Sequence, residues 1–192
     1  MRTVSLCVAL LLLSTGVVVA SSLEARVAES RKALKEFAGE LKGELLAALK
    51  KGGPVNAVTV CSQKAPTIAA RISKNKGWKV GRTSLKVRNP RNVPDGWERK
   101  ILEAFEERRR QGEDIGKLEH FEVVTEGEKS VFRYMKAIPA GELCLTCHGN
   151  EIAPDLAAKL GELYPEDQAT GFSFGEIRGA FTIKQPVESV GL

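Results

Sequence analysis

The chain has 192 residues, with 29 Lys plus Arg against 24 Asp plus Glu and a formal net charge of +5. Because 43% of its residues are hydrophobic and 28% are charged, the composition excludes a disordered or collagen-like chain. The length allows one domain with a helical extension, large enough to bury a core without disulfides. Aromatic residues make up only 6% of the chain, which disfavours a stacking surface for nucleic-acid bases.

Residues 1–20 have the pattern of a secretory signal peptide. Arg2 precedes an apolar run, and the small residues Val18 and Ala20 stand before the expected cleavage site. The alternative is an uncleaved anchor, but the apolar run is at the short limit for spanning a bilayer. We therefore expect cleavage after Ala20, export to the periplasm or a similar oxidising compartment, and no stable membrane span afterwards.

Residues 21–53 are predicted to form a long amphipathic helix, which Gly52 and Gly53 end. Its apolar stripe either packs on the chain's own domain or meets a second copy of the chain, which would give a homodimer through this helix. Residues 54–192 are expected to form the second folded region. The stripe consists of Leu23, Val27, Leu34, Phe37, Leu41, Leu45 and Leu49.

A second helix is expected over residues 56–74, with a kink or restart at Pro66, because proline removes a helical hydrogen bond. Short strands are expected at 78–80 and 85–88. A capping box at Asp95 and Glu98 then predicts a helix that ends in three arginines, Arg108, Arg109 and Arg110.

The C-terminal half is predicted to contain a hairpin over residues 120–125 and 130–138. A short helix and a strand over 177–184 follow, and the strand has a clear alternation of apolar and polar residues. In chain order these elements predict an α+β fold with an antiparallel sheet of about five strands.

Cys144, Cys147 and His148 form Cys-x-x-Cys-His, the attachment motif of haem c. Two thiols on one helical turn can both add to the vinyl groups of a porphyrin, which presses His148 against the iron as the proximal ligand. The motif predicts one covalently bound haem c per chain. A zinc site that includes Cys61 is one alternative, although adjacent Cys147 and His148 are awkward ligands for one tetrahedral ion. A redox-active dithiol is another, but it leaves His148 without a role.

Three side chains are candidates for the second axial position of the iron. His120 is expected on the solvated face of a strand, and Met135 is at a position more typical of core packing. Cys61 is either a small buried hydrophobic residue or the ligand, as thiolate, of a ferric haem. An unpaired thiol in an oxidising compartment is a liability unless something occupies it, which makes Cys61 the sharpest candidate.

Four segments together resemble the Tll-like c-type haem domain family. The resemblance implies a PAS-like fold, one covalent haem and a Cys thiolate opposite the motif His. By position, Cys61 falls in the segment that supplies the family's Cys ligand, and His148 is the motif His. Members of this family often precede signalling domains, and this sequence contains none. The segments are residues 57–69, 82–98, 136–149 and 167–186.

The stretch from Pro54 to Pro94 contains no Asp or Glu and is strongly basic. These cations would neutralise haem propionates, dock an acidic redox partner, or lie on solvated faces. Binding to nucleic acid is not expected for an exported chain. The nine cations are Lys64, Arg71, Lys74, Lys76, Lys79, Arg82, Lys86, Arg88 and Arg91.

The sequence therefore favours a non-enzymatic haem protein that senses redox state or a diatomic gas. A thiolate ligand favours ferric over ferrous iron, so we expect a low-spin haem of low potential whose bond to Cys61 weakens on reduction. The alternative is a single-haem electron carrier that docks an acidic redox partner. A haem enzyme is a poor third hypothesis, because His120 is the only spare histidine available for acid–base work.

Overall fold

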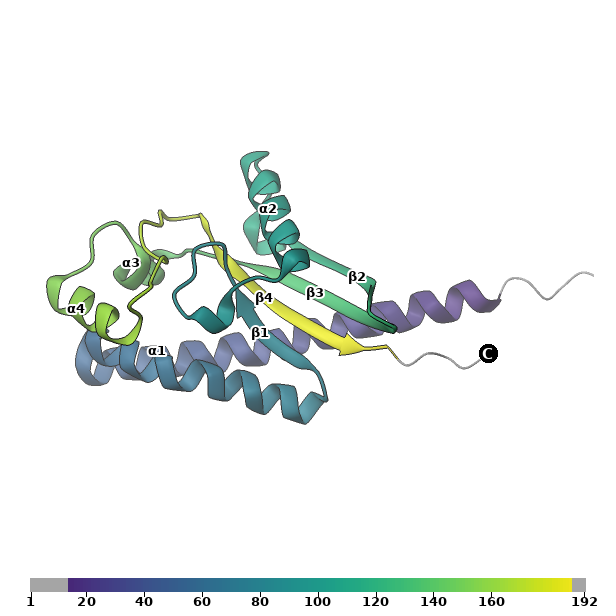
Figure 1. Ribbon diagram of the computed structural model, residues 1–192, viewed down its shortest axis with the longest axis horizontal. Coiled ribbons are helices and arrows are strands. Elements are labelled where there is room, and N and C mark those ends of the chain that lie inside the picture. The colour runs from purple at the N-terminus through teal and green to yellow at the C-terminus, as the bar shows by residue number, and fades with distance from the viewer. Residues whose placement is uncertain (1–13, 188–192) are drawn as a thin grey trace, which may run out of the picture.

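The computed structural model describes the backbone of residues 14–187 and the side chains of residues 23–187. A long helical hairpin lies on one face of an antiparallel sheet, and a single helix lies on the other (Figure 1). The α+β class is confirmed. The elements are α1 (Ser14–Lys76), β1 (Lys79–Thr83), η1 (Pro90–Asn92), α2 (Gly96–Arg110), η2 (Ile115–Lys117), β2 (Glu119–Glu126), β3 (Lys129–Pro139), α3 (Glu142–His148), α4 (Pro154–Leu163) and β4 (Ile177–Pro186).

Helix α1 consists of two halves that fold back on each other, and the break between them lies at Gly52 and Gly53, where the first helix was expected to end (Figure 1). Gly53 has a φ of 69°, a left-handed conformation that glycine adopts without steric penalty. The backbone stays helical through Pro66, so the expected restart there is wrong. Ion pairs such as Lys76–Glu29, at 2.8 Å, join the second half to the first.

The sheet has the order β1-β4-β3-β2, with each neighbouring pair antiparallel. The predicted hairpin and the C-terminal strand are confirmed, and so is the capping box of α2. The expected strand at 85–88 is wrong, which leaves four strands instead of five. That segment turns away from β1, because the side chains of Lys86 and Arg88 reach main-chain oxygens of the 167–170 loop and of α3.

Each face of the sheet has its own apolar core. Both halves of α1 pack on one face, where Phe37 and Ile72 meet Phe132, Tyr134 and Ile183 of the strands. Helix α2 packs on the other face through a second cluster. This cluster consists of Leu102, Phe105, Leu118, Met135, Ala137, Ile177 and Ala180. The apolar stripe of the first half of α1 is therefore at least partly covered by the chain's own domain.

The predicted signal peptide falls mostly outside the described residues, so its cleavage stays a prediction. Among the residues that the structure describes, no helix is long and apolar enough to cross a membrane.

Candidate functional site

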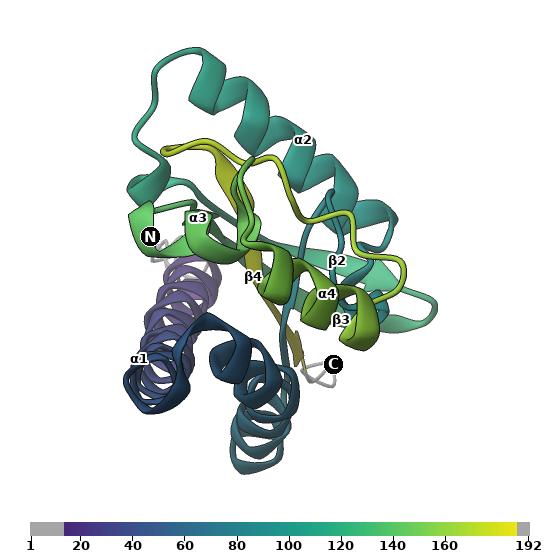
Figure 2. The ribbon, with the colours of Figure 1, turned by 90° about the vertical axis from the view of Figure 1, so that its left-hand side faces the viewer.

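The Cys-x-x-Cys-His motif forms α3, at the end of the sheet where α4 and the bend of α1 also lie (Figure 2). Val58 of α1 packs there with Leu156 and Leu160 of α4, and Cys147 lies against this cluster. The second half of α1 is thus fixed beside the motif. This packing places Cys61, less than one helical turn beyond Val58, on the segment that faces α3 and α4.

Cys61, Cys144 and Cys147 are all free thiols, and each is half-buried. Burial raises the pKa of the Cys61 thiol, the nearby Arg82 guanidinium opposes that rise, and Cys147 raises the pKa further. Burial likewise raises the pKa of Cys147, against the effect of Arg88. Cys61 therefore lies near the motif, and its role as an iron ligand stays a prediction.

His148 is held in a defined orientation. Its Nδ1 atom lies 2.7 Å from the carbonyl oxygen of Ala169, and its ring meets Phe172 edge-on at a centroid distance of 6.2 Å. Burial, then the charges of Arg178 and Arg88, lower the pKa of His148 to about 2. The ring is therefore neutral, with Nδ1 as the donor to Ala169, which leaves Nε2 as the nitrogen available to a metal.

Three guanidinium groups gather around this end of the molecule, and we call Arg82, Arg88 and Arg178 the arginine cluster. Burial, then the charges of Arg88 and Arg82, lower the pKa of Arg178 to about 10. Arg82 lies 5.7 Å from the ring centroid of Phe37, and burial lowers its pKa as well. In the described part of the chain, the cluster has one carboxylate in an ion pair, that of Asp167 with Arg88 at 2.8 Å.

This charge imbalance suits an anionic group. Like charges held together in a partly buried site are costly unless an anion lies between them. In addition, the Nε atom of Arg178 is buried without a hydrogen-bond partner. Two thiols, a neutral imidazole with a free Nε2 and excess guanidinium charge match the donors that a dicarboxylate macrocycle with a central iron requires. The residues present therefore fit a haem.

Sequence reasoning found Cys61, the motif and the two arginines of the basic stretch, but it missed Arg178, Asp167 and Ala169. Arg178 belongs to the predicted polar face of the last strand, but it alone of that face lies beside Arg88 and Arg82, whereas Thr182 and Lys184 contact Glu98 and Asp95. Asp167 and Ala169 lie in a loop without a pattern. The Asp167 carboxylate accepts a hydrogen bond from the Ala169 amide at 2.8 Å, which forms a local turn. An Asp–x–Ala sequence is not sufficient to predict such a turn.

The two other candidates for the second axial position lie in other surroundings. Met135 is fully buried in the cluster beneath α2, which confirms its expected packing role. His120 is partly exposed on β2, where its Nε2 lies 3.2 Å from Glu122 and its ring packs 5.9 Å from that of Trp97. The expected solvated position is therefore only partly confirmed, because Phe121 and Val123, on the opposite face of the strand, are the exposed side chains.

Five of the nine cations of the basic stretch fall into two groups. Lys64, Arg71 and Lys76 pair with carboxylates of the first half of α1. Arg82 and Arg88 turn toward the motif instead. The polarity of charge that the sequence suggests is thus partly cancelled by the folding of α1 on itself.

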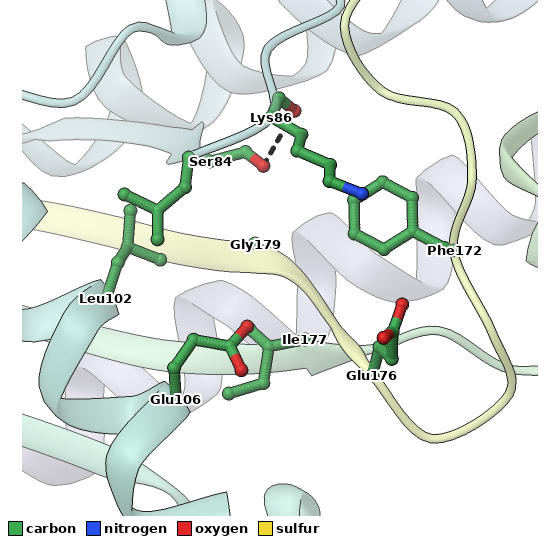
Figure 3. A pocket seen from close by; sticks show the side chains of 9 residues that line it. Ser84, Lys86, Leu102, Glu106, Phe172, Glu176, Ile177 and Gly179 are labelled. Carbon is green, nitrogen blue, oxygen red and sulfur yellow. Dashed lines mark hydrogen bonds between the residues drawn. The ribbon is translucent and has the colours of Figure 1, made fainter.

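A pocket of about 220 Å³ is lined in part by Phe172 (Figure 3). Ser84, Lys86 and Phe172 line it, together with Leu102 and Glu106 of α2. The Lys86 amine lies 4.8 Å from the ring centroid of Phe172. The pocket is smaller than those that usually hold ligands of drug size, and no Cys or His lines it, so it is not the site of the motif.

Comparisons with known proteins agree with these observations. The family model described as Tll0287-like matches residues 12–186. Among solved structures, the chain is similar to the cyanobacterial heme-protein Tll0287, with a TM-score of 0.66 and 22% identity over 87% of this chain and 98% of that one. No curated protein matches the chain. The structural match shows the fold that the two proteins share.

Proposed function

Since the chain belongs to the Tll0287-like family, we propose that it is an exported protein that carries one covalently bound haem c and senses redox state or a diatomic gas. Cys144 and Cys147 would hold the haem through thioether bonds, and His148 and Cys61 would bind its iron. A relative with the same fold is a heme-protein, which supports the class of cofactor. The observation that carries the proposal is the meeting of Cys61 with the motif and the arginine cluster at one half-buried end of the molecule.

The protein's own residues prepare the site for each part of this cofactor. His148 presents Nε2, because Nδ1 is bound to the Ala169 carbonyl. The arginine cluster provides fixed positive charge for the two propionates. When bound, the haem supplies a one-electron redox centre and, if one axial ligand leaves, a position for a small gas. Cys61 would decide how readily the site changes from redox chemistry to gas binding. Its thiolate stabilises ferric iron more than ferrous iron, so reduction would weaken its bond to the iron.

Mass spectrometry and absorption spectra test this proposal. Protein made in a host with intact cytochrome maturation is expected to gain the mass of one haem. The oxidised spectrum is expected to be low-spin, and carbon monoxide is expected to bind only after reduction. Cys61→Ala should change the oxidised spectrum and raise the midpoint potential, whereas Ser62→Ala, one residue further along α1, should change neither. A wild-type protein with the bare polypeptide mass would contradict the proposal.

The second candidate function is electron transfer to an acidic partner, and a surface feature favours it. A shallow hollow lies between the second half of α1 and η1, lined by Arg71, Lys74 and Arg91 among others. Lys74 and Arg91 form no ion pair with the residues that the structure describes, so they are free to attract an acidic surface. Reduction without any change of axial ligand would favour the carrier over the sensor. So would a rate of electron transfer to an acidic partner that falls steeply with salt and in the Lys74→Gln variant.

A further inference from the structure

Arg88 occupies an unusual place beside the motif. It lies in the segment that leaves β1 without forming the expected strand, and its side chain is only 10% exposed, as is that of Asp167 at 11%. Its Nη2 atom donates to two main-chain oxygens, that of Cys147 at 2.6 Å and that of Ala169 at 3.2 Å. One guanidinium therefore joins the residue directly before His148 to the carbonyl that His148 itself binds.

Asp167 closes this arrangement into a ring. Its Oδ2 atom accepts from the Nε of Arg88 at 2.9 Å, and its Oδ1 accepts from the amide of Ala169 at 2.8 Å. The peptide groups on both sides of Ala169 are thus fixed by the same ion pair. A guanidinium that meets one oxygen of Asp167 through both Nε and Nη2, with its donors in fixed directions, holds its geometry better than a single ammonium could.

The Ala169 carbonyl consequently has two donors, His148 Nδ1 and Arg88 Nη2. A carbonyl that already accepts from a cation is a weaker acceptor for a second donor. The imidazole then keeps its Nδ1 proton more firmly and gives less electron density to a metal at Nε2. Positive charge close to the metal acts in the same direction, because it favours the reduced state.

We propose that Arg88 is a positioning residue that tunes His148 as an iron ligand, by sharing the Ala169 carbonyl and by fixing the Cys147 peptide. This inference rests on the proposed function, because it requires iron at Nε2. Arg88 does not touch the iron. It acts through the carbonyl and the peptide that set the strength and the direction of the imidazole.

The test uses holoprotein with ¹⁵N-labelled histidine, reduced under carbon monoxide so that the iron is diamagnetic. The chain has only two histidines, so the spectrum contains the His148 signals and those of His120, which serve as an internal control. Arg88→Lys keeps the positive charge but loses the planar guanidinium group with its several fixed donors. Arg88→Gln removes both the charge and the guanidinium group. Arg91→Lys and Arg91→Gln are matched controls in the same segment.

In both Arg88 variants we expect the His148 Nδ1 resonance to shift toward stronger hydrogen bonding while the His120 signals stay in place. At a fixed ambient potential, the ratio of ferrous to ferric protein should fall about tenfold in Arg88→Gln and by less in Arg88→Lys. A tenfold change corresponds to the loss of about one charge-assisted hydrogen bond. An unchanged His148 resonance in Arg88→Lys would overturn the proposal and leave charge alone as the role of Arg88. If Arg88→Gln does not fold, the lysine variant decides. Failure of the proposed function is seen separately, as wild-type protein without haem mass.

Discussion

Two groups of buried arginine in this molecule have opposite surroundings. Arg133, on β3, is 3% exposed and forms ion pairs with three carboxylates, those of Asp95, Glu98 and Glu126. The arginine cluster beside the motif has three guanidinium groups and one paired carboxylate among the described residues. Arg133 and Arg178 each have an Nε without a partner, so the difference lies in the charge balance and not in that atom.

The two groups therefore differ in how the cost of burying a cation is offset. At Arg133, carboxylates already offset the cost of burying a cation, and the guanidinium stacks on Trp97 at 4.2 Å. At the arginine cluster the charge is left over, and folding alone does not compensate it. Surplus charge beside free thiols and an oriented imidazole is the pattern of a site prepared for an anionic cofactor. Four predictions test this division, beginning with the largest effect.

Of the four changes, Phe132→Ala should lower the free energy of unfolding most. Phe132 is fully buried in the core beneath α1, so its removal is expected to lower the free energy of unfolding by about 3–5 kcal/mol, as measured by urea denaturation. Phe174→Ala is the control, because that ring is 69% exposed and its loss should change the free energy of unfolding by less than about 0.5 kcal/mol. Equal effects of the two variants would contradict the assignment of the core.

Gly179→Ala tests the junction between the two regions. Gly179 has a φ of 154°, and a Cβ atom there would clash with the Thr83 carbonyl oxygen. We expect a loss of about 2 kcal/mol in the free energy of unfolding, because neither backbone can move without shifting β1 or β4. Gly81→Ala, whose Cβ would make only ordinary contact with Thr182 at 3.8 Å, should cost about 1 kcal/mol or less.

Arg82→Met should change the free energy of unfolding in opposite directions in the haem-free and the haem-loaded protein. In protein made without haem, loss of an uncompensated cation is expected to raise the free energy of unfolding by about 1 kcal/mol. In haem-loaded protein the same change should lower it, because a propionate loses its partner. Lys79→Met, an exposed position on the same strand, is the control and should leave both values unchanged. Destabilisation of the haem-free form by Arg82→Met would show that the charge is already compensated.

The smallest effect is the pH dependence of the Arg133 site. Burial would raise the pKa of Asp95, but hydrogen bonds from Arg133, the Glu98 amide and Lys184 lower it to about 2, from an ordinary value of 3.8. A depressed carboxyl pKa stabilises the folded state at pH values above the unfolded pKa. That stability is lost as the pH falls from about 4 to about 2. Because the side chain is 40% exposed, we expect no more than about 1 kcal/mol.

Urea denaturation at pH 5 and at pH 2.5 measures this loss. In Asp95→Asn the part of the pH dependence that belongs to this carboxyl should disappear, while the remaining carboxylates keep theirs. An identical pH dependence in the variant and the wild type would remove Asp95 from this role.

Local patterns predicted much of this molecule correctly. The capping box, the glycine bend of α1, the hairpin and the last strand depend on neighbours in the sequence, so residue type and spacing were sufficient. The strand expected at 85–88 was wrong for a tertiary reason. Its alternating Lys86 and Arg88 fit a half-solvated strand, but their side chains bind the 167–170 loop and α3, which sequence spacing does not reveal.

By itself the sequence determined the prediction of a haem-attachment motif, because the thiols of Cys144 and Cys147 and the imidazole of His148 would have to be close in the chain to act together. Only the tertiary structure decided what surrounds them. Arg178, Asp167 and the Ala169 carbonyl reach the motif from β4 and from an irregular loop, and Cys61 reaches it from α1. Contacts between distant segments depend on how whole elements pack, and no spacing along the chain encodes them.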